Sequence, residues 1–214
     1  MQTITIKCIE NKLNQNTYLV EFENCCVVID AGCSLNEIKQ QTQKPITAVF
    51  ITHGHFDHIL NIEEYNNLNI PIYASKHINQ MLENATNNAS IYFDSNKTFK
   101  LNNLNYVENL QEIKIENHKI QCLYTPGHTK DCMCYLIDNN LFSGDTVFAV
   151  AVGRDDLATA NTNELINSLN LILNLDYKLL YSGHGAASDK SKQQINIPKW
   201  IKYLSRAGHK AHIN

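Results

Sequence analysis

The chain has 214 residues, of which 43% are hydrophobic and 18% charged, and its formal net charge at pH 7 is -3. These proportions are ordinary for a folded globular protein and too apolar for an intrinsically disordered one. The 18 basic residues form no block of like charge, so the electrostatic pattern of a nucleic-acid-binding protein is missing. We expect one domain, residues 1–214, that acts on a small molecule and has no nucleic-acid partner.

The sequence contains no recognisable signal peptide or membrane-spanning segment. Residues 1–7 alternate like a strand and lack the apolar core of a signal peptide. No run reaches the roughly 18 apolar residues of a membrane span, so we expect a cytoplasmic protein without a membrane partner, of undetermined oligomeric state. The seven cysteines mostly lie in apolar, strand-like runs and are expected to be reduced and buried.

The first half of the chain starts with a predicted β-meander. Residues 3–9, 17–22 and 25–30 have the pattern of strands, with a two-residue hairpin loop at 23–24. Ser34 is a suitable N-cap for a helix to about residue 43, and residues 46–52 form the next predicted strand. A helix at 57–68, a strand at 70–74 and a helix at 75–85 follow, and residues 84–104 are expected to form a long surface connection.

The second half repeats this alternation. Strands are predicted at 111–115, 119–125, 132–137, 141–143 and 178–181, with a helix at 162–175. A helical tail is predicted at about residues 190–214, with Pro198 as a good first-turn residue. It should pack on the body, because four apolar residues lie on one helical face: Ile197, Trp200, Ile201 and Leu204. Two β-rich halves with flanking helices predict an α/β (α+β) fold with four layers, helix-sheet-sheet-helix.

A dense cluster of metal-ligand residues follows the predicted strand 46–52. His53-Gly54-His55-Phe56-Asp57-His58 places four ligand-type side chains within six residues. Two histidines at alternate positions followed by Asp-His can supply parts of two metal sites. A surface histidine cluster or a pH-responsive loop is the alternative for this segment on its own.

Three later segments each place one ligand-type residue in a turn after a predicted strand. They are residues 125–129 with His128, residues 143–146 with Asp145, and residues 182–185 with His184. Each contains glycine, which lets the backbone approach a site closely, and strand-end loops commonly carry functional groups. Together with the histidine cluster, these segments predict a metal site.

The motif H-x-H-x-D-H, with a later His, Asp and His in strand-end turns, resembles the metallo-β-lactamase superfamily over residues 14–190. Within it the chain looks most like glyoxalase II (hydroxyacylglutathione hydrolase)-like hydrolases, on the segments NTYLV at 16–20, VIDAG at 28–32, TPGHT at 125–129, LFSGDT at 141–146, GRD at 153–155 and SGHG at 182–185. The resemblance implies a four-layer αββα sandwich. It also implies one metal ion on His53, His55 and His128, a second on Asp57, His58 and His184, and Asp145 as the bridge.

The chemistry of these ligands agrees with two divalent metal ions. Imidazole and carboxylate suit Zn²⁺, and Fe or Mn could occupy the same ligands. Two cations lower the pKa of a shared water and give a hydroxide near neutral pH, which would attack a carbonyl that one metal polarises. Asp57 is the candidate catalytic residue, because it could orient the water or shuttle its proton.

Further candidate residues have two open interpretations each. Arg154 could hold a substrate carboxylate or pair with one of the aspartates that follow it. Asn16 and Tyr18 match a family strand near the floor of the active site and could contact substrate or only pack. Asp30 could hydrogen-bond a ligand histidine or merely form a turn. Histidines outside the motifs are expected to be solvated: His77, His118, His209 and His212.

The resemblance implies hydrolysis of a small-molecule thioester, represented by hydroxyacylglutathione. Only residues 185–214 follow His184, whereas glyoxalase II carries a larger helical domain that helps to bind glutathione, so glutathione recognition stays open. A persulfide dioxygenase with a single iron, a lactonase of the same superfamily and a metal-stabilised binding module without catalysis are the alternatives.

Overall fold

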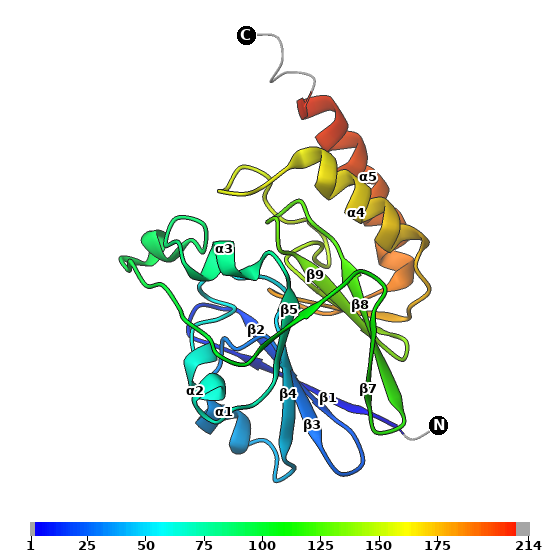
Figure 1. Cartoon of the computed structure of the whole chain (residues 1–214). Helices are drawn as coiled ribbons and strands as arrows, with labels where there is room; N and C mark the ends of the chain where they lie inside the picture. Colours follow the sequence, from blue (N-terminus) through cyan, green and yellow to red (C-terminus); the bar gives the residue numbers. More distant parts are fainter. Residues whose placement is uncertain (1–2, 209–214) are drawn as a thin grey trace.

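Two six-stranded β-sheets lie face to face in the computed structural model, which describes residues 3–208 (Figure 1). The first sheet contains, from edge to edge, β1 (Thr5–Glu10), β2 (Asn16–Glu21), β3 (Cys26–Ile29), β4 (Ile46–Phe50), β5 (Ile72–Ser75) and β6 (Leu104–Val107). The second contains β12 (Ser188–Asp189), β11 (Leu179–Ser182), β10 (Asn140–Gly144), β9 (Met133–Ile137), β8 (His118–Tyr124) and β7 (Glu112–Ile115).

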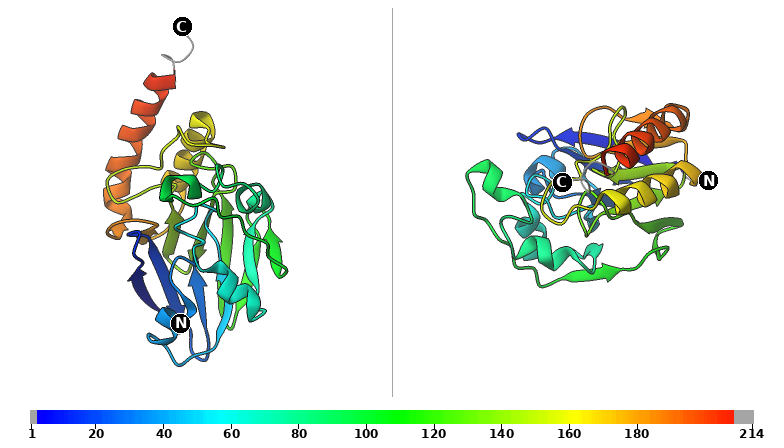
Figure 2. Two further views of the ribbon diagram at one scale, coloured as in Figure 1. Left: turned by 90° about the vertical axis from the view of Figure 1, so that its left-hand side faces the viewer. Right: turned by 90° about the horizontal axis from the view of Figure 1, so that it is seen from above.

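Helices cover the outer face of each sheet (Figures 1 and 2). The first sheet is covered by α1 (Leu35–Lys39), α2 (Ile62–Asn67) and α3 (Ile78–Leu82), and the second by α4 (Thr162–Asn174) and α5 (Lys190–Gly208). A short 3-10 helix, η1 (Ser90–Phe93), lies in the connection between α3 and β6. The predicted four-layer αββα sandwich is therefore confirmed.

The alternation of side chains along the strands explains the three separate cores. On β4, Val49 packs toward α1–α3, whereas its neighbour Phe50 packs between the two sheets. On β8, Cys122 faces the space between the sheets and Leu123 faces α4 and α5. Successive strand residues point to opposite faces, so strands that are buried on both faces serve two cores at once.

One edge of the sandwich is held together by hydrogen bonds between the sheets. The Met133 N–H donates to the Thr52 carbonyl at 2.7 Å, and the Tyr135 hydroxyl donates to the Ile51 carbonyl at 2.7 Å. These bonds join the strand end after β4 to the start of β9. The predicted ligand segments lie at this edge.

The helix predicted for residues 57–68 begins only at Ile62. Residues 57–61 form turns that the end of β3 holds in place, because the Ala31 N–H donates to the His58 carbonyl at 2.7 Å and Asn61 N–H donates to the Ala31 carbonyl at 2.9 Å. These tertiary bonds replace the helical ones that the local pattern favoured. The helices predicted to extend to residue 43 and over 75–85 are also shorter, at Leu35–Lys39 and Ile78–Leu82.

The terminal helix differs from the prediction in the place of its proline. It starts at Lys190, and Pro198 lies inside it rather than in its first turn. The predicted apolar face is present, with Ile197 and Leu204 buried against α4 and the second sheet. Residues 209–214 of the predicted tail lie outside the described residues. Two strands, β6 and β12, were not predicted at all.

The cysteines and isolated histidines are only partly as expected. All seven thiols are free and six are buried, but Cys8 is exposed. His118 is buried rather than solvated, with its Nδ1 3.1 Å from Oδ2 of Asp138 and its ring against Phe22. His209 and His212 lie outside the described residues. Among residues 3–208, no helix is both long and apolar enough for a bilayer crossing.

Candidate metal centre

Four strand ends bring the predicted ligands together at one edge of the sandwich. They are the ends of β4, β8, β10 and β11, which are followed by residues 53–58, His128, Asp145 and His184. Glycine makes the close approach possible, since a Cβ on Gly183 would lie 2.2 Å from Oδ1 of Asp145. Gly144 has a φ of +49°, which a side chain would strain.

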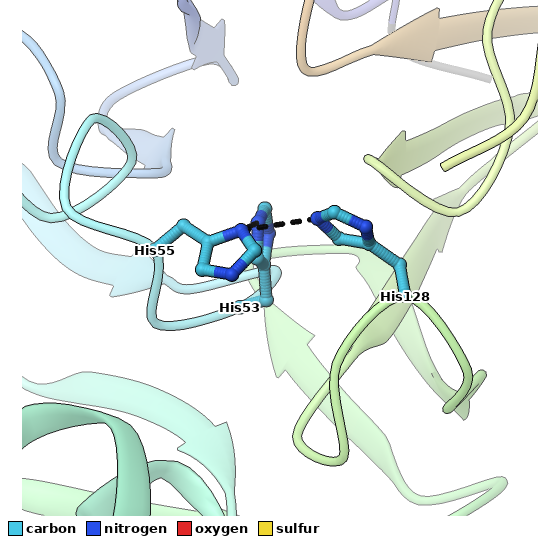
Figure 3. Close-up of side chains that lie close together, drawn as sticks. All are labelled: His53, His55 and His128. Carbon is cyan, nitrogen blue, oxygen red and sulfur yellow. Dashed lines mark hydrogen bonds between the residues drawn. The ribbon is translucent and has the colours of Figure 1, made fainter. Parts of the chain in front are cut away.

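The first group of converging atoms consists of three imidazole nitrogens (Figure 3). Nδ1 of His55 lies 3.0 Å from Nε2 of His53 and 3.0 Å from Nε2 of His128. His53 and His55 come from the loop after β4 in the first sheet, whereas His128 comes from the loop after β8 in the second. All three side chains are buried.

The hydrogen bonds of the ring nitrogens that point away from the group indicate the tautomers of His128 and His53. His128 Nδ1 donates to the Arg154 carbonyl at 2.8 Å, so its Nε2 carries the lone pair. His53 Nδ1 lies 3.2 Å from the Thr52 hydroxyl, which itself donates to Asp30, so we assign the proton of His53 to Nδ1 as well. Two lone pairs then face the single Nδ1 of His55, which has at most one proton to offer. A cation would satisfy all three nitrogens.

The second group consists of Asp57, His58 and His184. His184 Nε2 lies 3.1 Å from Oδ2 of Asp57, and His58 Nε2 lies 3.8 Å from the same oxygen. His184 Nδ1 donates to the Asn14 carbonyl at 2.8 Å, which again directs Nε2 toward the group.

Asp145 lies between the two groups. Its Oδ1 is 3.3 Å from His58 Nε2, and its Oδ2 is 3.7 Å from His128 Nε2 and 3.5 Å from His184 Nε2. Oδ1 of Asp145 and Nε2 of His58 are buried and, apart from their approach to each other and that of Nε2 to Asp57, have no partner in the described structure. Buried polar atoms nearly always have partners, so these two atoms fit ligands of a metal ion.

The pKa values of the first histidine group and of Asp145 suit metal binding, whereas the carboxylates around His58 and His184 outweigh burial and raise the pKa of these two histidines. Burial and the neighbouring histidines hold the pKa of His53 well below its usual value, and burial together with His128 lowers that of His55 to about 3. Burial alone would raise the pKa of Asp145, but the histidines around it outweigh burial and lower it. Neutral imidazoles and ionised carboxylates are the protonation states that metal ions need.

Asp30 has the supporting role that was one of its two interpretations. Its Oδ2 accepts from His58 Nδ1 at 2.7 Å, and its Oδ1 accepts from the Thr52 N–H at 2.7 Å. Asp30 is buried and has a φ of +63°, a conformation that Asp tolerates better than most residues. It therefore fixes the orientation of one histidine and the start of the ligand loop.

Asn16 and Tyr18 lie beneath the site rather than on its surface. The Asn16 amide donates to the carbonyls of Ser182 and Gly185, at 3.1 and 2.8 Å, and the Tyr18 hydroxyl donates to Ser182 at 2.6 Å. Both side chains are buried, so their polar atoms hold the loop that carries His184. This placement supports a positioning role rather than the substrate contact that was one of their two interpretations.

Arg154 is exposed at the edge of the site. Its guanidinium makes a two-pronged ion pair with Asp156, at 2.9 and 3.0 Å, which is the alternative to a substrate carboxylate. Its carbonyl accepts the His128 hydrogen bond. The main chain of this residue thus supports the site, while its side chain is already paired.

Two supporting features were not predicted. Asp131 is buried and accepts the Gly54 N–H, and it lacks any motif that would have marked it. Helix α5 holds the loop after Asp145, because Gln193 donates to the Phe148 carbonyl at 3.0 Å and Trp200 donates to the Val150 carbonyl at 3.1 Å. The Phe148 ring in turn lies 6.2 Å from the His184 ring.

Residues 11–184, which include all seven converging side chains, match the family model of the metallo-beta-lactamase superfamily. The chain belongs to this superfamily. Its fold is similar to that of solved metallo-beta-lactamases. The crystal structure of BLEG-1, a B3 metallo-beta-lactamase, matches with a TM-score of 0.80 and 25% sequence identity, and the match covers 91% of this chain and 99% of BLEG-1. Membership in this superfamily and the converging ligand side chains support a metal-dependent hydrolase.

Two relatives differ in the share of their own length that this chain covers. A protein of Methanocaldococcus jannaschii named "Probable metallo-hydrolase" is 32% identical over 193 residues, which are 83% of this chain and 90% of that protein. The hydroxyacylglutathione hydrolase of Francisella philomiragia is 33% identical over 174 residues, 78% of this chain and 61% of that enzyme. The chain thus spans most of the length of the first relative but less than two thirds of the second.

Proposed function

We propose that this metallo-hydrolase uses two divalent metal ions to hydrolyse a small-molecule thioester of the hydroxyacylglutathione type. The observation that carries the proposal is the position of Asp145, whose two carboxylate oxygens lie within 3.7 Å of histidines from both groups. A structural metal site needs only four ligands, and seven converging side chains exceed that. Similarity to a hydroxyacylglutathione hydrolase supports the thioester.

In this proposal each group holds one ion. His53, His55 and His128 would bind the first, Asp57, His58 and His184 the second, and Asp145 both. Six of the seven side chains offer nitrogen or carboxylate oxygen from buried positions, a ligand set that suits Zn²⁺ and also accepts Fe or Mn. Bound ions would lower the pKa of a coordinated water and polarise a carbonyl group.

The exposure of the ligands indicates where substrate enters. The side chain of His184 is 33% exposed, whereas those of Asp57 and Asp145 are 12% and 10% exposed and that of His58 is fully buried. Substrate would therefore approach from the side of His184 and the Phe148 loop. Val150 in that loop is largely exposed and offers an apolar surface next to the entrance.

Asp57 is the residue that we propose for proton handling. It is near the open side, and the histidines His58 and His184 outweigh the effect of burial and lower its pKa, which keeps it ionised. An ionised carboxylate can orient a water molecule or accept its proton. The leaving thiol needs little help, because a thiol pKa of about 8.5 makes the thiolate a good leaving group.

The test combines metal analysis with turnover. Purified protein should contain close to two metal ions per chain and hydrolyse S-lactoylglutathione, and a chelator should remove both properties. A panel without glutathione, such as acetyl thioesters of simple thiols, shows whether the thiol carrier is recognised. Binding of two ions without turnover of any thioester would overturn the thioester assignment.

The same preparation distinguishes the other members of the superfamily. Oxygen uptake on glutathione persulfide with a single iron per chain would indicate the dioxygenase chemistry instead. Hydrolysis of lactones in preference to thioesters would indicate a lactonase. The presence of the full second ligand group, His58 and His184 included, favours hydrolysis over the mononuclear iron site.

A further inference from the structure

The first histidine group depends on the distance between two loops from different sheets. His53 and His55 follow β4, while His128 follows β8, and their nitrogens converge only if the two loops keep their spacing (Figure 3). A displacement of 1 Å is large compared with the tolerance of a metal–ligand bond, which is about 0.2 Å. Contacts between these loops should therefore control metal affinity.

Asp131 makes such a contact from a buried position. Its Oδ2 accepts from the Gly54 N–H at 2.8 Å, and Gly54 lies between His53 and His55. Its Oδ1 accepts from the Thr129 hydroxyl at 2.6 Å, and Thr129 follows His128 directly. One carboxylate thus links the backbone of the first ligand loop to the residue beside the third histidine.

The cost of this arrangement indicates more than packing. Asp131 is 1% exposed, and among the described residues its carboxylate forms no ion pair with Lys, Arg or His. Burying a carboxylate without a cationic partner is unfavourable, and an apolar residue of similar size would often be as stable. What Asp131 supplies at this position is a pair of acceptors that join the two loops carrying the first histidine group.

Asp131 and Asp30 both hold the backbone of the loop that carries His53 and His55. Asp30 accepts the Thr52 N–H, and Asp131 accepts the Gly54 N–H two residues later. His53 therefore lies between two backbone positions that are each held by a buried carboxylate. Asp30 fixes the side of the loop toward His58, and Asp131 fixes the side toward His128.

We propose that Asp131 is a positioning residue that sets the spacing of the His53–His55 loop and His128 and thereby the affinity of the first metal position. The proposal rests on the metal centre of the proposed function. Its effect should be specific to this histidine group, because the hydrogen bonds of its carboxylate go to Gly54 and Thr129, which adjoin His53, His55 and His128. Loss of a hydrogen-bonded partner of this kind typically weakens metal binding roughly 10–100-fold.

The test isolates the first position in a His184→Ala parent, which lacks one ligand of the second group. Zn²⁺ affinity is measured by competition with a chromogenic chelator, together with urea unfolding of the metal-free proteins. Asp131→Ala in this parent should weaken Zn²⁺ binding roughly 10–100-fold. Asp131→Asn keeps an acceptor for Gly54 and should restore affinity to within a few-fold. Asp138→Ala, which removes a carboxylate next to His118 and away from the site, is the matched control and should bind as the parent does.

The outcomes separate this proposal from the metal centre itself. If the His184→Ala parent binds no metal ion, the assignment of the first histidine group fails. If the parent binds Zn²⁺ and Asp131→Ala binds it equally well, even with a lower free energy of unfolding, Asp131 is only structural and the proposal is wrong. If Asp131→Ala does not fold, Thr129→Val removes the other half of the link and should weaken binding several-fold; unchanged affinity there overturns the proposal.

Discussion

Nδ1 of His58 lies 2.7 Å from Oδ2 of Asp30, and both side chains are buried. The hydrogen bond leaves Nε2 of His58 directed toward Asp57 and Asp145. A carboxylate that holds the outer nitrogen of a ligand histidine fixes its orientation and increases its basicity. The pair therefore couples the end of β3 to the metal centre.

Asp30→Asn tests this coupling. Asn tolerates the left-handed backbone at this position, so the fold should survive, but the charged acceptor of His58 is lost. We expect metal affinity to fall roughly 10-fold or more. Chelator competition measures it, with Asp138→Asn as a control for a carboxylate outside the site. Equal affinity in the Asp30 variant and the wild type would show that His58 is oriented without Asp30.

Asp145→Ala should remove metal and activity together. The two groups lose their shared carboxylate, and the histidines that face it lose their compensating charge. We expect less than one metal ion per chain by elemental analysis and thioester turnover reduced by at least about 100-fold, as for loss of a main electrostatic contributor. Asp156→Ala, an exposed carboxylate in the following loop, should keep both metal ions. Full activity of Asp145→Ala would disprove the bridging role.

Removal of metal should lower stability as well as activity. Ions that bind only the folded state stabilise it by about 4 kcal/mol when their concentration is 1,000 times Kd. For a chain of this length that corresponds to roughly 8–16 °C in Tm. Thermal unfolding monitored by circular dichroism, before and after dialysis against a chelator, measures the shift, and Zn²⁺ should reverse it. A Tm that does not respond to chelator or Zn²⁺ would argue against occupied sites.

Tyr18→Phe should weaken the second group selectively. The variant keeps the ring contacts with Phe142 and Tyr181 but loses the hydroxyl that donates to Ser182 near His184. Loss of a buried hydrogen bond costs about 1 kcal/mol of folding stability. We therefore expect the metal ion of the second group to be bound more weakly and released more readily. Tyr65→Phe removes a similar buried hydroxyl, which donates to the Cys33 carbonyl away from the loop. Both variants should lose similar stability, but only Tyr18→Phe should lose metal; the same metal loss in both would remove the specific role of Tyr18.

Ser34 and Glu37 provide a test outside the site. They form a reciprocal capping box at α1, and the hydrogen bonds from Ser34 lower the pKa of Glu37. Ser34→Ala should cost about 1 kcal/mol of unfolding free energy. Because the pKa of Glu37 is lowered on folding, its contribution is present above the unfolded value of about 4.3 and is lost as pH falls through the folded value. Urea unfolding at pH 7 and pH 3 should show a smaller effect of Ser34→Ala at pH 3, with Ser205→Ala as a neutral control. An equal effect at both pH values would contradict the role of the charge.

The sequence alone was sufficient for the layers and for the ligand types. Alternating apolar residues predict strands because side chains point to opposite faces, and β2, β3, β4, β8 and β9 lie close to where the pattern placed them. Ligand chemistry is local in the same way: His53, His55, Asp57 and His58 are adjacent in the chain, so their spacing is visible without a fold. Turn glycines before or after His128, Asp145 and His184 marked the rest.

Tertiary structure decided the features that depend on contacts between distant segments. The turn at 57–61 replaces a predicted helix because Ala31 takes its hydrogen bonds, and β6 forms an edge strand without apolar alternation because β5 pairs with it. Asn16 and Tyr18 became supports of the His184 loop because β2 lies beneath it. Asp131 had no recognisable pattern, because its meaning depends on Gly54, which is 77 residues earlier in the chain. Local sequence encodes propensity and donor chemistry, whereas the partner of a buried polar atom is set only when the two sheets come together.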